Sequence, residues 1–98
     1  MITITAIIET KKGHEETMKM ALMEVAAYVK LNEPETLNFF ICQDLNEPNI
    51  FTSYERFSSV EAMEKHNKSE IVGHFFKIAE PILANDIRIQ TCEELFTK

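Results

Sequence analysis

The feature that most limits the fold of this chain is the order in which two hydrophobic periods alternate along it. Four stretches have the two-residue period of a β-strand, because successive side chains of a strand point to opposite faces of a sheet. These strand-like stretches are residues 2–10, 36–44, 50–57 and 86–95. The first of them, ITITAIIET, is typical of a half-buried strand, since an isoleucine or alanine takes every second position.

Two helical regions separate these strands. In residues 14–33, apolar side chains recur at intervals of three and four, and acidic residues stand in the first turn, where the helix dipole favours them. Pro34 disfavours a helical conformation for the residue before it, so we expect this helix to end near residue 33. The second region divides into a short helix that starts at residue 59 and a longer one over residues 69–84. Pro81 should kink or fray the last turn of the longer helix.

Two capping patterns set the starts of the second and third helices. Ser58 and Glu61 have the S-x-x-E spacing of a capping box, which places the first helical residue at position 59. Asn67 and Glu70 repeat this spacing in a weaker form. We therefore expect the third helix to follow Asn67.

Strand, helix, strand, strand, helix, strand is the order of the split β-α-β, or ferredoxin-like, fold. We predict an α+β fold with a four-stranded antiparallel sheet, and residues 1–98 as a single domain. Because β-α-β crossovers are right-handed, the helical regions should cover the same face of the sheet. RNA-recognition motifs share this order, but the strand IFTSYERF lacks their basic-glycine-aromatic pattern.

The stretch LNFFIC is apolar on both of its faces. Phe39 and Ile41 point to one face of the sheet, and Phe40 and Cys42 point to the other. If helices cover one face, the other face stays bare, and an exposed apolar sheet face is an interaction surface or a liability. We therefore predict a homodimer in which two sheets pack face to face. The same topology places Cys42 and Cys92 at opposite sheet edges, too far apart for a disulfide.

Net charge and composition limit the kinds of partner that we expect this protein to bind. The formal net charge of −6 opposes binding to nucleic acid or to an anionic membrane. No apolar stretch approaches the roughly 20 residues that a membrane helix needs, and the first strand begins too early to leave room for a signal peptide. We expect a cytoplasmic protein with no nucleic-acid and no membrane partner.

One block of the sequence resembles a known family. The block YERFSSVEA at residues 54–62, with His66 at the end of the short helix, resembles the antibiotic biosynthesis monooxygenase family, including its small quinol monooxygenase and autoinducer-2-processing relatives. The stretch KKGHEE after the first strand and the step Glu33-Pro34 add to the resemblance. It covers essentially the whole chain.

The resemblance implies a ferredoxin-like subunit, a dimeric α/β barrel and a ligand pocket between helices and sheet. For some members it also implies oxygenation without metal or flavin, so we expect no cofactor. Two departures stand out: Phe57 replaces a tryptophan that is frequent in the family, and Glu35-Thr36 replaces a Gly-Cys pair. The positions that bind haem in a related branch carry Ile7 or Ile8, Phe57 and approximately Phe76 here, so we expect no haem.

His66 and Glu55 are the candidate catalytic residues. Imidazole titrates near neutral pH, so His66 can take a proton from a carbon acid or phenol and return it. The alternative for His66 is a solvent-facing residue at a helix end. Glu55 shares its strand face with aromatic residues, so its carboxylate must find a donor or change its pKa. It could orient His66, hold a substrate hydroxyl, or form a structural ion pair.

Four further residues are candidate substrate contacts, and no metal site is expected. The contacts are Phe51, Ser53 and Phe57, on the strand face of Glu55, and Tyr28, on the first helix. The three histidines have no matched carboxylate spacing, which argues against a metal ion.

The function implied by the resemblance is that of a small cofactor-independent monooxygenase. Its substrate would be a quinol-like, phenolic or enolisable small molecule, and His66 would be the general base. Two alternatives remain open: an isomerase of an autoinducer-like carbonyl compound, which needs the same base, and a dimer that binds a small ligand without turnover.

Overall fold

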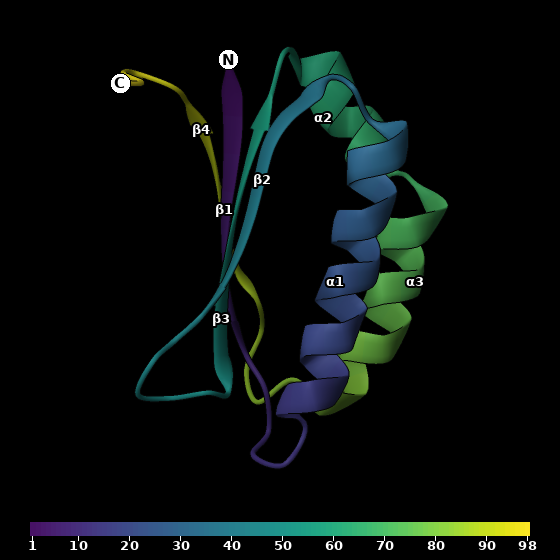
Figure 1. The fold of residues 1–98 in the computed structure, drawn as a ribbon, viewed down its shortest axis with the longest axis vertical. Coiled ribbons are helices and arrows are strands. Elements are labelled where there is room, and N and C mark those ends of the chain that lie inside the picture. The colour runs from purple at the N-terminus through teal and green to yellow at the C-terminus, as the bar shows by residue number, and fades with distance from the viewer.

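The computed structural model describes residues 1–98 and has the predicted order of elements (Figure 1). The strands are β1 (Ile2–Glu9), β2 (Thr36–Gln43), β3 (Ile50–Phe57) and β4 (Arg88–Glu93). The helices are α1 (Glu15–Asn32), α2 (Val60–Asn67) and α3 (Glu70–Ala79). A 3-10 turn, Glu80–Ile82, continues α3 through Pro81, so the predicted disturbance of its last turn is confirmed.

The four strands form one antiparallel sheet in the order β2-β3-β1-β4. All helices lie on one side of this sheet, with α1 and α3 side by side (Figure 1). The ferredoxin-like fold is therefore confirmed. Cys42 on β2 and Cys92 on β4 lie on opposite edge strands, and both are free thiols.

The helix starts differ from the capping predictions. Ser59, not Ser58, caps α2, because its hydroxyl accepts a hydrogen bond from the backbone N–H of Ala62 at 3.1 Å. Ser58 instead donates its hydroxyl to Glu35, which follows α1 in the chain, at 3.1 Å. Similarly, Ser69 rather than Asn67 caps α3. The predicted caps thus lie one and two residues before the observed ones, and each helix starts one residue later than predicted.

The core fills the space between the sheet and the helices. Its larger cluster joins Ile8 and Phe51 of the sheet to a buried stripe of α1 and to Phe75 of α3. That α1 stripe consists of Met18, Ala21, Leu22, Val25 and Val29. A smaller cluster of Ile4, Phe57 and Ala62 holds α2 against the sheet. Full burial of a valine, leucine, isoleucine, phenylalanine or methionine side chain contributes about 1.5–3 kcal/mol to folding.

The other face of the sheet is mixed rather than uniformly apolar. Phe40 stacks on Tyr54 with ring centroids 6.0 Å apart, and the Phe40 side chain is 56% exposed. The guanidinium of Arg56 donates to both carboxylate oxygens of Glu94 in the same chain, which helps to hold the pKa of Glu94 at about 2. Neighbouring positions on this face are largely polar: Thr3, Thr5, Thr52, Arg88 and Gln90. The expectation of a bare, apolar sheet face opposite the helices is thus only partly met.

None of the helices has the length and apolar character needed to cross a membrane.

Candidate functional site

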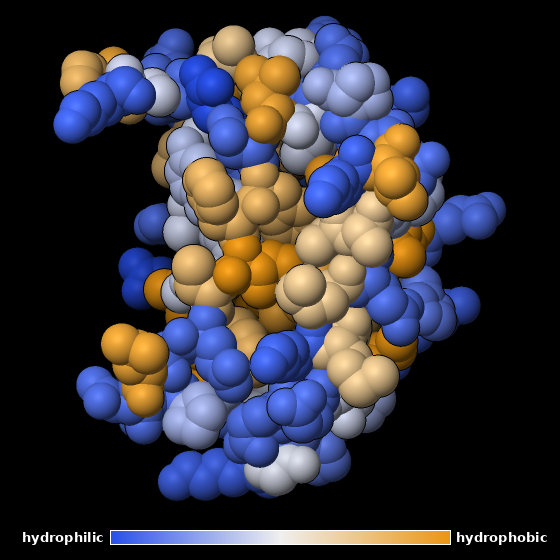
Figure 2. Space-filling view, in the orientation of Figure 1, coloured by the Kyte–Doolittle hydropathy of each residue, from blue (hydrophilic) through white to orange (hydrophobic).

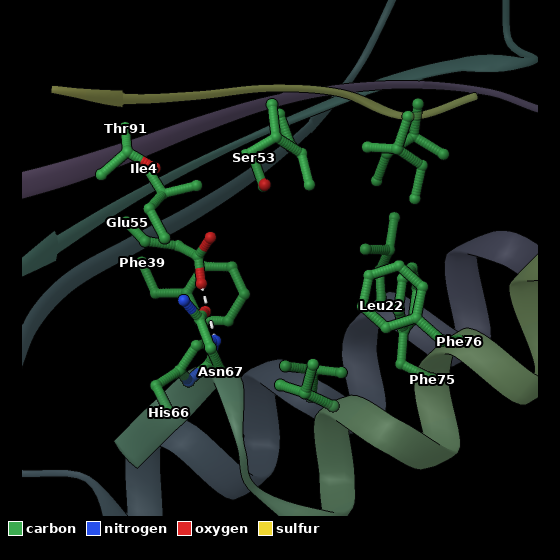
Figure 3. Close-up of a pocket in the computed structure, with 16 residues that line it drawn as sticks. Ile4, Leu22, Phe39, Ser53, Glu55, His66, Asn67, Phe75, Phe76 and Thr91 are labelled. Carbon is green, nitrogen blue, oxygen red and sulfur yellow. Dashed lines mark ion pairs between the residues drawn. The ribbon is translucent and has the colours of Figure 1, made fainter. Parts of the chain in front are cut away.

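A cavity of about 220 Å³ lies between the sheet and the helices, with His66 on one side and Leu22, Phe75 and Phe76 on the other (Figure 3). Eleven of its sixteen lining residues are hydrophobic. The polar ones are Ser53, Glu55, His66, Asn67 and Thr91. A cavity of about 150 Å³ can bind benzene, whereas pockets for drug-sized ligands start near 300 Å³. The volume therefore fits a molecule of one or two rings.

The seam between sheet and helices is apolar at the surface as well. Figure 2 shows hydrophobic side chains gathered along it on one face of the molecule. Because apolar surface is stabilised when it is removed from water, this lining favours binding of an apolar ring over a strongly hydrated ligand.

His66 stands at one end of the cavity because of how α2 is fixed. It is the penultimate residue of α2, whose start is capped by Ser59. Phe57 packs beneath α2, and its ring centroid is 5.4 Å from that of His66, while Phe39 meets the imidazole edge-on at 6.2 Å. Only 4% of His66 is exposed.

Each nitrogen of the His66 ring faces a carboxylate. On the cavity side, Nε2 lies 2.7 Å from Oε1 of Glu55. On the other side, Nδ1 is hydrogen-bonded to Oε1 of Glu33 at 2.8 Å. The same oxygen of Glu33 accepts the hydroxyl of Thr36 at 2.7 Å. Glu33 directly follows α1, so the ends of two helices and strand β3 meet at the imidazole.

These carboxylates control the charge of the ring. Burial lowers the pKa of His66, but the interactions with Glu55 and then with Glu33 outweigh burial, so the pKa is raised above its ordinary value of 6.5. The protonated ring can serve both carboxylates at once. The neutral ring has only one N–H, so one nitrogen then faces a carboxylate with its lone pair. The three side chains form a compact unit that can store and release a proton.

Two polar groups on β3 face the cavity without a partner in the chain. Ser53 and Glu55 are neighbours on the inner face of the strand, 7% and 8% exposed. The Ser53 hydroxyl makes no hydrogen bond within the chain, and neither does Oε2 of Glu55; both groups point into the cavity in Figure 3. Buried polar groups usually have partners, so these two are available to a ligand.

The three-residue unit does not have the shape of a metal site. Glu33 and Glu55 approach opposite nitrogens of the ring, so their oxygens do not converge on one point. No group of three histidine, cysteine or acidic side chains is placed to hold a metal ion.

The sequence pattern of the antibiotic biosynthesis monooxygenase family matches residues 1–78, which is most of the chain and includes the unit around His66. The chain belongs to the antibiotic biosynthesis monooxygenase family. No curated protein matches the sequence.

Solved structures share the fold of this family member throughout. A Pseudomonas aeruginosa protein is 25% identical, with a TM-score of 0.87 over 97% of this chain and 94% of its own. Structures described as candidate antibiotic biosynthesis monooxygenases come from Caulobacter crescentus and Nitrosomonas europaea. The first is 19% identical, with a TM-score of 0.89 over 97% of this chain and 90% of its own. The second is 18% identical, with a TM-score of 0.89 over 98% of this chain and 100% of its own.

The structure brings three of the six residues predicted from the sequence together around the cavity. His66, Glu55 and Ser53 line it. Phe57 supports the His66 ring from within the smaller core cluster, and Phe51 belongs to the larger one; neither lines the cavity. Tyr28 is 39% exposed on α1 and is not a lining residue. The geometry therefore gives no support to Phe51, Phe57 or Tyr28 as direct ligand contacts.

Glu33 is part of the site but is not among the candidate residues predicted from the sequence, where it marks the end of the first helix and belongs to the Glu33-Pro34 step. The signal that could have found it is the family-like Glu-Pro step itself, because a fixed helix end holds an acidic side chain in one place. The other two histidines lie outside the site: His74 contacts Glu24 at 3.5 Å on the surface, and His14 precedes α1.

Proposed function

We propose that this protein is a small monooxygenase that acts on a quinol-like, phenolic or enolisable molecule, with His66 as the general base. The observation that carries the proposal is a buried imidazole, held between two carboxylates, at the end of an apolar cavity of about 220 Å³. Membership of the antibiotic biosynthesis monooxygenase family supports the reaction class.

The proposed chemistry needs a base, an apolar cavity and dioxygen. Loss of a proton from the substrate gives a phenolate or carbanion, which is electron-rich enough to reduce dioxygen itself. The resulting peroxide then breaks so that one oxygen atom remains on the substrate and the other leaves as water. All the electrons come from the substrate. The apolar lining keeps water from the anion, and the polar end stabilises its charge.

His66 acts as a base through Nε2, which faces the cavity, while Glu33 holds Nδ1. Because only the neutral ring can accept a proton, the rate should rise as the pH passes upward through the raised pKa of His66. Glu55 stands beside Nε2 and, with Ser53, offers hydrogen-bonding positions to the oxygens of the substrate.

The test is oxygen uptake by the purified protein with a panel of hydroquinones, hydroxynaphthalenes and enolisable ketones, measured above the uncatalysed rate. We expect uptake with at least one compound, and incorporation of one atom from ¹⁸O₂ into the product. His66→Gln should reduce the rate at least 100-fold. His74→Gln, which changes a surface histidine, should leave it unchanged.

Other outcomes favour the alternatives. A rearranged product without oxygen uptake would support an isomerase, since that reaction uses the same base. Tight binding without any change in the ligand would support a binding protein. Equal oxygen uptake by wild type and His66→Gln would rule out His66 as the base.

We also propose that a second copy of this chain covers the mixed face of the sheet. No helix lies on that face, and it exposes Phe40, with Tyr54 stacked against it, and Ile7. Beyond β4, Leu95 and Phe96 are almost fully exposed. A domain of this size has a modest core, so burial of these side chains in a homodimer would add to its stability.

A further inference from the structure

His66 separates two different cavities. Besides the large apolar cavity, it lines a small one of about 70 Å³ on the far side of the ring. His66 is the only residue that both cavities share. Six of the eight residues that line the small cavity have polar or charged side chains, among them Glu33, Glu35 and Lys65. Since a water molecule occupies about 30 Å³ in the liquid, this space can hold one or two waters.

The hydrogen bonds form a continuous path between the two cavities. Glu55 faces the apolar cavity and lies 2.7 Å from Nε2 of His66. Nδ1 of the same ring is hydrogen-bonded at 2.8 Å to Glu33, which lines the polar cavity. Oε1 of Glu33 is held by Thr36, whereas its Oε2 has no partner in the chain. A proton can therefore pass through the imidazole without any movement of the backbone.

We propose that Glu33 is a proton-relay residue, which exchanges the Nδ1 proton of His66 with water in the small polar cavity while the substrate occupies the apolar one. This inference rests on the proposed function, because it concerns the base of that reaction. Glu33 does not touch the apolar cavity, so its role is exerted through His66.

Over one turnover, the protons and electrons moved by this mechanism balance. In the first half, a substrate proton bonds to Nε2, and the Nδ1 proton passes to Glu33 and on to water. The substrate anion then adds to dioxygen and forms a peroxide. The O–O bond then breaks while the hydrogen on the peroxide carbon passes as a proton to the departing oxygen, which gives a carbonyl on the substrate and a hydroxide ion. In the second half, a proton returns from water through Glu33 to Nδ1, and the Nε2 proton converts the hydroxide to water. The ring ends in its starting tautomer, and the substrate supplies all four electrons that reduce dioxygen.

The ionisable groups around the ring are few. Glu55 comes from β3, Glu33 from the end of α1, and Glu35 and Lys65 line the small cavity without contacting the imidazole at hydrogen-bond distance. Glu35 instead accepts the hydroxyl of Ser58. Glu35 is thus a matched control: it is an acidic residue of the same small cavity that lies outside the relay.

The first experiment uses oxygen uptake with 1,4-dihydroxynaphthalene as the probe. In Glu33→Gln we expect kcat to fall at least tenfold and the rising limb of the pH profile to move to lower pH. The limb moves because the ring loses a carboxylate that favours its protonated form. In Glu33→Ala, added formate, small enough to enter the polar cavity, should restore much of kcat. Glu35→Gln should behave as wild type. Wild-type kinetics in Glu33→Gln, or no rescue of Glu33→Ala by formate, would overturn the relay.

The second experiment needs no turnover, so it separates failure of the relay from failure of the proposed function. Nitrogen NMR of the ring identifies which nitrogen carries the proton once His66 is neutral. The relay requires the proton on Nδ1 in the wild type, and a lower His66 pKa in Glu33→Gln but not in Glu35→Gln. A neutral ring protonated on Nε2 would overturn the proposal even if the enzyme consumes oxygen. If the neutral ring is protonated on Nδ1 but the protein oxidises none of the probes, the proton path from His66 to Glu33 would be supported and only the proposed oxygenase reaction would be refuted.

Discussion

The Glu33–His66–Glu55 unit is costly to bury unless it stays charged and paired. Isolated buried charges destabilise a fold by several kcal/mol, but a protonated imidazole between two carboxylates gives every charge a partner. The unit also has support from its surroundings, since Thr36 holds Glu33 and two aromatic rings pack against the imidazole. Such an arrangement ties the stability of the protein to the protonation of one ring.

The first prediction concerns stability against pH. The folded pKa of His66 is raised above its unfolded value of 6.5. Its stabilising effect is therefore complete below pH 6.5 and is lost as the pH rises through the folded pKa. We expect the free energy of unfolding in urea to fall between pH 6 and pH 9, as the ring loses the proton that the two carboxylates stabilise.

The control for this prediction is His66→Gln, which should lack that slope although its overall stability is lower. His74→Gln should keep it, because His74 is exposed. A wild-type stability that does not change over this pH range would contradict the charge arrangement described for His66.

The second prediction concerns Ser53, whose hydroxyl faces the cavity without a partner. A hydrogen bond from this hydroxyl to a ligand contributes about 0.5–1.5 kcal/mol. Ser53→Ala should therefore raise the dissociation constant of a bound naphthoquinone about 3- to 10-fold, measured by titration calorimetry, with little change in melting temperature. Unchanged affinity would show that the ligand does not reach β3 at this position.

Part of the site was predictable from the sequence. His66 was singled out by the resemblance and its known acid-base chemistry, and Glu55 because an acidic residue on an apolar strand face requires a partner. Glu33 was harder to predict, because it lies 33 residues from His66 and meets it only through tertiary structure; the Glu33-Pro34 step was its signal in the sequence. Phe51 and Phe57, on the strand face of Glu55, were predicted as ligand contacts; both belong to the core and neither lines the cavity.

The order of strands and helices follows from the hydrophobic periods of the sequence. Their first and last residues depend on contacts between residues that are distant in the chain. The alternation of strand and helix periods was sufficient to predict the sheet and the side that the helices cover. The start of α2 was not, since Ser58 and Ser59 are equally suitable caps by residue type. Ser58 bonds to Glu35, which leaves Ser59 as the cap.

The third prediction tests this assignment of the cap. Ser59→Ala should lower the free energy of unfolding by about 1 kcal/mol, the usual cost of losing an N-cap, and should also loosen the helix that carries His66. Ser58→Ala should cost less, since its bond to Glu35 is exposed. Chemical denaturation of the two variants measures the difference. A larger loss in Ser58→Ala would mean that the helix begins earlier than described.

At the scale of the whole molecule, one face of the sheet is occupied by helices and the other is open (Figure 1). The open face combines an aromatic pair with polar positions, so a partner there would bury both kinds of surface. This composition is common in protein interfaces, which are not much more apolar than the remaining surface. The sequence indicated Phe40 on this face but not the intrachain pairing of Arg56 with Glu94, because that pairing joins β3 to the segment after β4.

The fourth prediction is that the protein is a dimer at micromolar concentration. Sedimentation should give twice the mass of the 11.3 kDa chain. Phe40→Glu should shift the equilibrium toward monomers, because it places a charge within the proposed interface. Leu45→Glu, at an almost fully exposed position in the loop between β2 and β3, is the control and should remain dimeric. Folded monomers of the wild type at this concentration would contradict the proposed homodimer.

The most direct test of the central claim is a crystal structure of the protein with 2-hydroxy-1,4-naphthoquinone, a stable analogue of an oxygenated quinol. We expect the two rings to fill the apolar cavity and one ligand oxygen to lie within hydrogen-bond distance of Nε2 of His66 or of Glu55. A cavity closed by its own side chains, or a ligand bound only outside it, would contradict the account.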